Sequence, residues 1–345
     1  KAAFAFDEAY SIEQLPEKMP ELLANQPALW WPFATHKGFE ENVERWLDVV
    51  RGKVRQFVSA PRAQIDLCAL VDEMRLVKDA HEIDVMRRAA QISAEAHKRA
   101  MRASKPGLRE YHLEAEILHH FRMNGSQFPA YGSIVATGPN ACVLHYRADA
   151  AELRDGDLCL IDAGCELDSY ASDITRTFPV NGKFTGPQKA LYEIVLDSQL
   201  KAIDATRVGR RFTDPHVAAT RVLVQGMLDT GLLDKAKVGS DIDDIVAKGA
   251  HTQFYMHRTG HWLGMDVHDV GDYKVGGEWR VLEPGMVLTV EPGLYISAGG
   301  KGVAKKWWNI GIRIEDDVLV TPTGCVVLSA AMPKTADEVE ALMQA

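Results

Sequence analysis

The sequence predicts an α+β fold in which the order helix, helix, sheet occurs twice. Two pairs of helices are expected, within about 79–123 and 185–230, and each pair precedes segments with the alternation typical of β-strands. The two halves share no obvious sequence identity, so the internal duplication rests on the order of the elements. A chain of 345 residues has room for two domains, and we place them at 1–75 and 76–345.

The N-terminal domain is expected to be small and to end in a connector. Its opening residues are rich in Trp and Pro. A helix is expected over 39–50, because several apolar side chains fall on one of its faces, and a connector helix is expected over 64–76. The apolar face consists of Phe39, Val43, Trp46, Leu47 and Val50. Such a stripe is typical of a core or an interface rather than of a ligand site.

Capping signals mark the long helices of the larger domain. Asp79 and Glu82 form a capping box before the first helix, which is expected to continue to Met101. Asp214-Pro215 is typical of the start of the last helix in the two pairs. The other helices are expected at about 109–123 and 185–205, with the last at 214–230.

Strands of the larger domain are predicted from period-2 alternation. They are expected at about 133–136, 143–146, 286–290 and 309–320. A β-hairpin is expected in addition within 158–179. Asn181-Gly182 predicts a further tight hairpin turn.

Composition restricts the class of protein. The hydrophobic fraction of 46% and the charged fraction of 25% are those of a soluble globular protein. The formal net charge of -9 argues against a nucleic-acid partner, and no apolar run predicts a membrane span or a leader. The five cysteines form no Cys-x-x-Cys pair, and several lie in apolar strands. We expect reduced core thiols and a cytoplasmic protein.

The hairpin within 158–179 contains two carboxylates in unfavourable positions. If the chain folds about the Leu167–Asp168 bond, Asp162 lies directly opposite Asp173. Side chains opposed in this way are roughly 4.5–5.5 Å apart, and like charges there destabilise a sheet. Asp162 follows apolar residues, so burial is expected as well. Buried carboxylates must share a proton, find cations or bind metal. The two carboxylates therefore indicate that the hairpin forms one side of a metal site.

Three histidines and a glutamate are candidates for the same site. His257, His261 and His268 lie within twelve positions, among glycines. A single histidine is more often structural, but this grouping favours a functional site. No Glu follows the first histidine as in a zinc-protease helix, so a loop and strand are expected here. Glu291 ends an apolar strand before a proline, and taken alone it is better explained as a solvent-facing carboxylate.

A last strand adds a cation and a carboxylate. Alternation over 310–316 places isoleucines in the core, with Gly311, Arg313 and Glu315 on the other face. Arg313 and Glu315 are compatible with a simple surface ion pair, whereas Gly311 suggests that another group approaches the sheet closely.

The candidate ligands together are four carboxylates and one imidazole, which is too much negative charge for a single zinc ion. The set suits two divalent cations bridged by carboxylates, and Mn²⁺, which prefers oxygen ligands, fits better than a thiolate-seeking metal. The candidates are Asp162, Asp173, His261, Glu291 and Glu315.

From about residue 76 to the C-terminus, the chain resembles the proline-specific metallopeptidases of the pita-bread fold, and among them the Xaa-Pro aminopeptidase (aminopeptidase P) family. The resemblance rests on IDAGCELDSYASDITRTFP, HRTGHWLGMDVHDVG, LTVEPGLYI and GIRIEDD. It implies a pita-bread catalytic domain with two Mn²⁺ per chain and a homo-oligomer, dimer or tetramer. It also implies a preceding domain about twice as long as 1–75, which is therefore expected to be partial.

The resemblance assigns a role to each candidate ligand. Asp162 would bind one metal, His261 and Glu291 the other, and Asp173 and Glu315 would bridge the two. A hydroxide between the metals would be the nucleophile.

Other residues are implied to act on the substrate. Glu291 would accept a proton, and His257 and His268 would hold the scissile carbonyl and its oxyanion. His145, in VLHY, would be a further substrate-side histidine. Arg313 would orient and partly neutralise the carboxylates, and it is expected to pair with Glu315.

The implied activity is removal of the N-terminal residue from peptides with proline at the second position. Prolidase, which cleaves only Xaa-Pro dipeptides, is the main alternative because it shares the fold and ligands. Methionine aminopeptidase fits the histidine pattern less well. Creatinase, a metal-free relative, and a non-catalytic pita-bread binding module are disfavoured because all candidate ligands are present.

Overall fold

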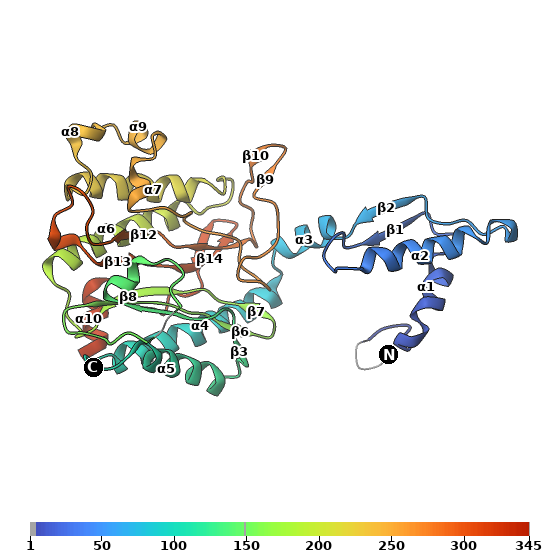
Figure 1. Cartoon of the computed structure of the whole chain (residues 1–345), viewed down its shortest axis with the longest axis horizontal. Coiled ribbons are helices and arrows are strands. Elements are labelled where there is room, and N and C mark those ends of the chain that lie inside the picture. The colour runs from blue at the N-terminus through green and yellow to red at the C-terminus, as the bar shows by residue number, and fades with distance from the viewer. Residues whose placement is uncertain (1–4, 148–149, 345) are drawn as a thin grey trace. The chain divides into compact units, whose positions relative to one another are not determined.

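The structure is a computed structural model, and it describes residues 5–147 and 150–344. The chain divides into two compact units, Lys1–Met74 and Arg75–Ala345, which are described separately (Figure 1). Within the described residues, no helix is both long enough and apolar enough to cross a membrane.

The first unit packs helices against a two-stranded parallel sheet. Strand β1 pairs with β2, and one face of α2 supplies most of the buried apolar side chains, which confirms the predicted helix. The elements are η2 (Ile12–Gln14), α1 (Leu15–Leu23), β1 (Ala28–Trp31), α2 (Phe39–Arg51), η3 (Val54–Gln56), β2 (Ala63–Asp66) and α3 (Cys68–Leu76).

The predicted connector helix over 64–76 is wrong in its first residues. Gln64 and Ile65 belong to β2, and α3 begins only at Cys68. The pairing with β1 explains the difference, because Trp31 donates its indole N–H to the Gln64 side chain at 3.0 Å. Trp31 and Gln64 are 33 positions apart in the chain, so a local helical pattern cannot predict their contact.

The helices of the second unit include the two predicted pairs, each with bounds within two residues of the prediction. Asp79 caps α4 by accepting the backbone N–H groups of His81 and Glu82, and Thr185 caps α6. The long helices are α4 (Ala80–Ala103), α5 (Glu110–Met123), α6 (Gly186–Ala205) and α7 (Asp214–Asp229). The shorter ones are η4 (Gly138–Cys142), α8 (Lys235–Val238), α9 (Ile242–Ala247), η5 (Ala250–Gln253), η6 (Lys305–Trp307) and α10 (Ala336–Gln344).

Most strands of the second unit lie between the two helix pairs (Figure 1). In Figure 1, α4 and α5 lie on one side of the strands and α6 and α7 on the other, and the main apolar core includes side chains from both pairs. The first half contains β3 (Phe128–Pro129), β4 (Ile134–Thr137), β5 (Leu158–Asp162), β6 (Cys165–Leu167), β7 (Tyr170–Ala171) and β8 (Thr175–Pro179). The second half contains β9 (Lys274–Val275), β10 (Glu278–Trp279), β11 (Val287–Val290), β12 (Gly293–Ile296), β13 (Ile310–Arg313), β14 (Asp316–Thr321) and β15 (Gly324–Val327).

The sheets are small and largely antiparallel. The strand orders are β3-β6-β7 and β4-β5-β8 in the first half, and β11-β14-β15 and β12-β13 in the second. The helix pairs with curved sheets in each half confirm the α+β fold with internal duplication.

Three strand predictions are corrected. The segment 143–146 is a turn that follows η4, and Asn181-Gly182 leads into α6 instead of closing a hairpin. The segment 309–320 is two strands, because the chain breaks at Ile314-Glu315 to pass from β13 to β14. Cys159 and Cys165 are buried, as predicted, but Cys68, Cys142 and Cys325 are only partly buried, and all five cysteines are free thiols.

Candidate metal centre

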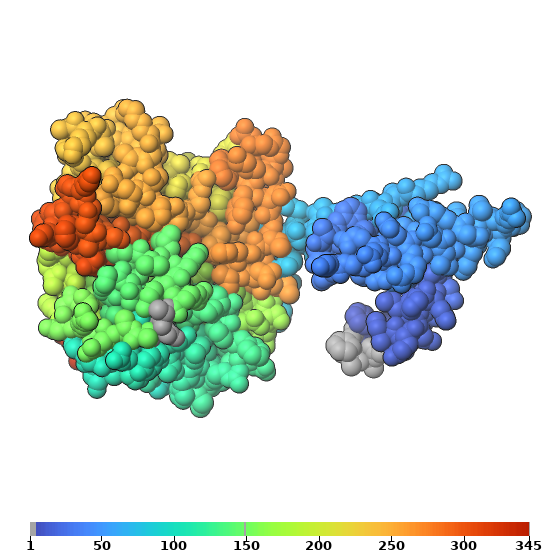
Figure 2. Space-filling view, in the orientation of Figure 1, coloured from blue at the N-terminus to red at the C-terminus, as the bar shows by residue number. Residues whose placement is uncertain are grey.

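A pocket of about 670 Å³ in the second unit brings together every site residue predicted from the sequence. Figure 2 shows the surface of this unit hollowed between the α8–α9 region and the β9–β10 hairpin. The predicted residues that line the pocket are His145, Asp162, Asp173, His257, His261, His268, Glu291, Arg313 and Glu315.

The ends of strands position the carboxylates. Asp162 is the last residue of β5, Glu291 directly follows β11, and Glu315 lies at the break between β13 and β14. His261 lies beside β11, because its carbonyl oxygen accepts the Thr289 N–H at 3.0 Å. Strand ends from both halves of the duplicated domain therefore meet at one point.

The predicted register of the hairpin is wrong by two residues. Asp162 is paired with Thr175, not with Asp173, because the turn is centred on Asp168 and Ser169, both with positive φ. The side chains of Asp162 and Asp173 are nevertheless close. The hydroxyl of Tyr131 lies 2.6 Å from Asp162 Oδ1 and 2.5 Å from Asp173 Oδ1.

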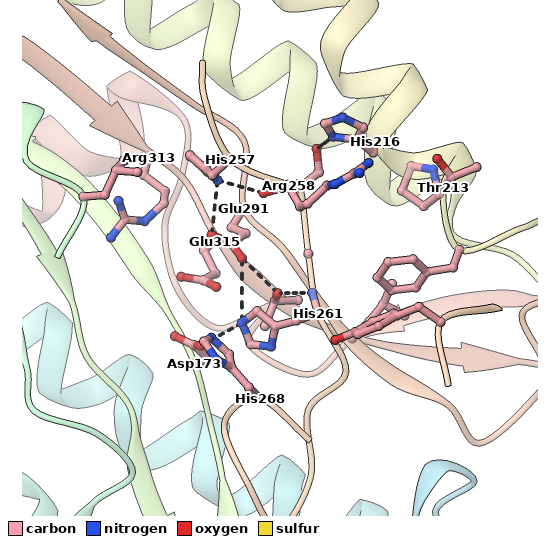
Figure 3. A pocket seen from close by; sticks show the side chains of 18 of the residues that line it. Asp173, Thr213, His216, His257, Arg258, His261, His268, Glu291, Arg313 and Glu315 are labelled. Atoms are coloured by element: carbon pink, nitrogen blue, oxygen red, sulfur yellow. Dashed lines mark hydrogen bonds and ion pairs between the residues drawn. The ribbon is translucent and has the colours of Figure 1, made fainter. Parts of the chain in front are cut away.

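The carboxylates of Asp173, Glu291 and Glu315 lie on one side of the His261 imidazole (Figure 3). Its Nε2 atom lies 3.4 Å from Asp173 Oδ2 and 3.7 Å from Glu291 Oε1. One ligand atom from each of Asp173, His261 and Glu315 lies within 4.8 Å of the other two. This spacing brings carboxylate and imidazole donors within reach of a common cation.

Burial and mutual repulsion make the carboxylates difficult to ionise. Burial, with the charge of Asp173, raises the pKa of Glu315 well above its usual value. Burial raises the pKa of Glu291 to about 7, and it also raises the pKa of Asp173. Burial opposes protonation of His261, but its contacts with Asp173 and Glu291 outweigh this and raise its pKa to about 9. A cation would relieve this repulsion, and the oxygen-rich donor set fits a divalent metal.

Backbone and hydroxyl donors fix two of the carboxylates. The Thr175 hydroxyl donates to Glu315 Oε2 at 2.5 Å. The backbone N–H of Asp173 donates to Asp317 Oδ2 at 3.2 Å, so a further buried acid holds the backbone between β7 and β8.

The predicted pairing of Arg313 with Glu315 is wrong. Arg313 donates to Asp162 Oδ2 at 2.5 Å and to the Tyr295 hydroxyl at 3.0 Å. Arg313 ends β13, and its guanidinium reaches across to the end of β5. Gly311 permits a close approach, as predicted: an added Cβ would lie 2.2 Å from the carbonyl oxygen of Ala141.

The histidines outside the cluster differ in their freedom to donate. Burial lowers the pKa of His257 to about 4, so the ring is neutral. Its Nδ1 lies 2.7 Å from the Arg258 carbonyl oxygen, which only accepts, so Nδ1 carries the proton and Nε2 faces the Tyr295 hydroxyl at 2.9 Å. The ring of His268 lies 4.3 Å from that of His261, and within the described residues it has no hydrogen bond.

Several residues of the site were missed by sequence reasoning. Tyr131 contacts Asp162 and Asp173, and it is a single aromatic residue in a segment without a recognisable pattern. Tyr295 contacts Arg313 and His257, and the motif that contains it was quoted without a role for the tyrosine. His216, from α7, also lines the pocket, and its Nδ1 lies 2.9 Å from the Thr259 hydroxyl. Burial lowers the pKa of His216 to about 4.

A family comparison agrees with this geometry: the model of metallopeptidase family M24 matches residues 84–322. The chain belongs to family M24. The Xaa-Pro aminopeptidase of Escherichia coli (strain K12) is 44% identical over 339 residues, which are 98% of this chain and 75% of that protein.

Solved aminopeptidase structures have the same fold. Aminopeptidase PepP of Pseudomonas aeruginosa superposes with a TM-score of 0.96 at 51% identity, over 99% of this chain and 76% of that one. Proline aminopeptidase P II from Yersinia pestis superposes with a TM-score of 0.93 at 45% identity, over 99% of this chain and 77% of that one. The predicted pita-bread fold is confirmed.

Proposed function

We propose that this M24 protein is a metallo-aminopeptidase that hydrolyses the N-terminal Xaa-Pro bond of peptides. The observation that carries the proposal is the convergence of four carboxylates and His261 in one pocket. The names of the similar proteins, Xaa-Pro aminopeptidase and aminopeptidase P, support the choice of substrate.

Two Mn²⁺ ions per chain are the proposed cofactor. The residues proposed to hold them are Asp162, Asp173, His261, Glu291 and Glu315. The metal would act as a Lewis acid and lower the pKa of a water molecule from about 15.7 toward about 7. Asp173 and Glu315 are the proposed bridging ligands, because each has an oxygen within the tight group around His261.

The substrate must be held without its amide proton. An Xaa-Pro bond is a tertiary amide, so no N–H is available for a peptidase to bind. The acidic cluster offers an alternative, because its carboxylates attract the cationic α-amino group. Because the α-amino group must be free and cationic to bind in this way, we expect a preference for peptides with free N-termini.

His268 is the proposed donor to the scissile carbonyl oxygen, since its ring forms no hydrogen bond with any residue that the structure describes. His257 was expected to share this role. The proton of His257 is on Nδ1, which donates to the Arg258 carbonyl, while Nε2 accepts from the Tyr295 hydroxyl, so donation to a substrate requires that Nδ1 give up the Arg258 contact. Glu291 is the proposed proton acceptor, and in the metal-free protein burial raises its pKa to about 7. His145 is exposed at the pocket and is proposed to contact the substrate.

We also propose that the protein is cytoplasmic and forms a homo-oligomer, dimer or tetramer. The five free thiols support a reducing compartment. The oligomer follows from the family resemblance.

A peptide series separates this function from prolidase. Ala-Pro, Ala-Pro-Ala, Ala-Ala-Ala and N-acetyl-Ala-Pro-Ala are compared at equal concentration with Mn²⁺ present. We expect cleavage of Ala-Pro-Ala, with little cleavage of Ala-Ala-Ala or of the acetylated peptide. Cleavage of Ala-Pro alone would identify a prolidase, and no cleavage of any peptide by the metal-loaded protein would favour a binding module.

A further inference from the structure

The pocket has a positively charged part outside the acidic cluster. Arg258, Lys274 and Trp279 all line it. The Nζ atom of Lys274 lies 4.6 Å from the centroid of the Trp279 ring, and the Cζ atom of Arg258 lies 5.6 Å from the same ring. Figure 3 shows Arg258 directed toward His216, away from Asp173. Two cations therefore share one indole.

The indole belongs to a continuous aromatic wall. Lys274 and Trp279 are direct partners in the β9–β10 pair. Trp279 stacks on Phe212 at a centroid distance of 6.3 Å, and Phe212 lies 4.6 Å from both Tyr273 and Trp262. Trp262 is fully buried and directly follows His261. The wall thus connects the cations to the proposed metal centre through packed rings.

The charges of Arg258 and Lys274 are not neutralised by the protein. Among the described residues, neither cation forms an ion pair, and both are exposed. Asp272 is the one other acidic residue on the pocket wall outside the proposed ligands, and within the described residues its carboxylate forms no ion pair with Arg258 or Lys274. Contact with an aromatic face attracts a cation without removing its charge. Both cations are therefore available to an anionic ligand.

We propose that Arg258, Lys274 and Trp279 form a subsite that binds peptide residues after the proline and favours a carboxylate there. This inference rests on the proposed function. A peptide is cationic at its amino end, which suits the acidic cluster, so its carboxyl side is directed to the remaining part of the pocket. The carboxylate can be an acidic side chain or the C-terminal carboxylate.

The expected preference is modest because the cations are exposed. One exposed charge pair changes a rate or binding constant roughly 1.5- to 5-fold, so two cations give roughly two- to twenty-five-fold. The preference should weaken as salt is raised, since exposed charges are screened.

The test measures kcat/KM for paired substrates. Ala-Pro-Glu amide is compared with Ala-Pro-Gln amide to measure the effect of a side-chain carboxylate. Ala-Pro-Ala is compared with its amide to measure the effect of a terminal carboxylate. We expect the acidic member to be preferred in at least one pair, and the pair that shows the preference identifies the source.

Variants assign the preference to the subsite. Arg258→Gln and Lys274→Gln should each reduce the ratio of acidic to neutral kcat/KM, and Lys274→Glu should bring it to one or below. Lys306→Gln is the matched control, because its amine also lies 4.5 Å from a tryptophan ring, that of Trp307, but outside the pocket. The control should keep the wild-type ratio.

Two results would overturn the subsite: equal kcat/KM for both pairs, or a preference that survives in Lys274→Glu. Cleavage of the neutral amides reports the proposed function separately. If no peptide is cleaved, calorimetric binding of Pro-Glu amide and Pro-Gln amide decides the matter. Tighter binding of the acidic product by wild type, lost in Lys274→Glu, supports the subsite, and equal binding contradicts it.

Discussion

The guanidinium of Arg313 lies 2.5 Å from the carboxylate of Asp162, although 151 positions separate the two residues in the chain. Both side chains are largely buried, at 5% and 13% exposed. Arg313 also donates to Tyr295, whose hydroxyl faces His257. The contact links the ends of β5 and β13 and balances part of the acidic charge in the site.

Loss of Arg313 should be costly in the metal-free protein. Breaking a buried pair leaves an uncompensated charge, so Arg313→Met should lower the free energy of unfolding by about 3–5 kcal/mol. Arg99→Met is the control, because Arg99 and Glu116 form an exposed pair whose loss should cost at most about 1 kcal/mol. Urea unfolding with a chelator measures both. Equal losses would show that the Asp162 contact contributes no more than a surface pair.

Asp173→Ala should abolish peptide hydrolysis and remove at least one metal per chain. The metal-free variant should be as stable as the wild type or more stable, because burial raises the pKa of Asp173 and its ionised form is unfavourable. Elemental analysis and thermal unfolding of the chelated proteins provide the readouts. A variant that retains both metals would exclude Asp173 as a ligand.

Glu291 should make the stability of the metal-free protein depend on pH. The pKa is raised from 4.5 to about 7, so the ionised form destabilises the folded state. The free energy of unfolding should fall between about pH 4.5 and pH 7, by on the order of 3 kcal/mol. Glu291→Gln removes this contribution, so its advantage over the wild type should be larger at pH 8 than at pH 5. An advantage that is the same at both pH values would contradict the raised pKa.

His268 should act on the substrate without holding metal. We expect His268→Ala to keep a near wild-type metal content while kcat falls by roughly two to three powers of ten, the loss typical of one oxyanion donor. His257→Ala is the comparison. A smaller loss is expected there, because the Tyr295 hydroxyl already faces its Nε2 atom. Loss of metal in either variant would make that histidine a ligand.

Local patterns in the sequence predicted the long helices and several candidate site residues, whereas His145 and the role of Glu291 came from the family resemblance. The capping box of Asp79 and Glu82 and the apolar face of α2 are local features, and both appear in the structure as predicted. The acidic positions were found because carboxylates interrupt apolar strands. Their convergence in one pocket followed from element order and from the family resemblance.

Pairings between distant segments were predicted less well. The hairpin register was wrong by two residues because the turn at Asp168 and Ser169 contains no glycine to mark it. The partner of Arg313 was assigned from proximity along one strand, whereas the structure provides Asp162 from another sheet. Tyr131 was missed because its contacts with the two aspartates depend on that same packing.

The most direct test is a titration of the chelated protein with Mn²⁺ while Ala-Pro-Ala cleavage is followed. We predict no cleavage without metal and full activity at two equivalents per chain, with Asp173→Ala inactive at any Mn²⁺ concentration. Full activity in wild-type protein shown by elemental analysis to be metal-free would contradict the assignment of the acidic cluster as the metal centre.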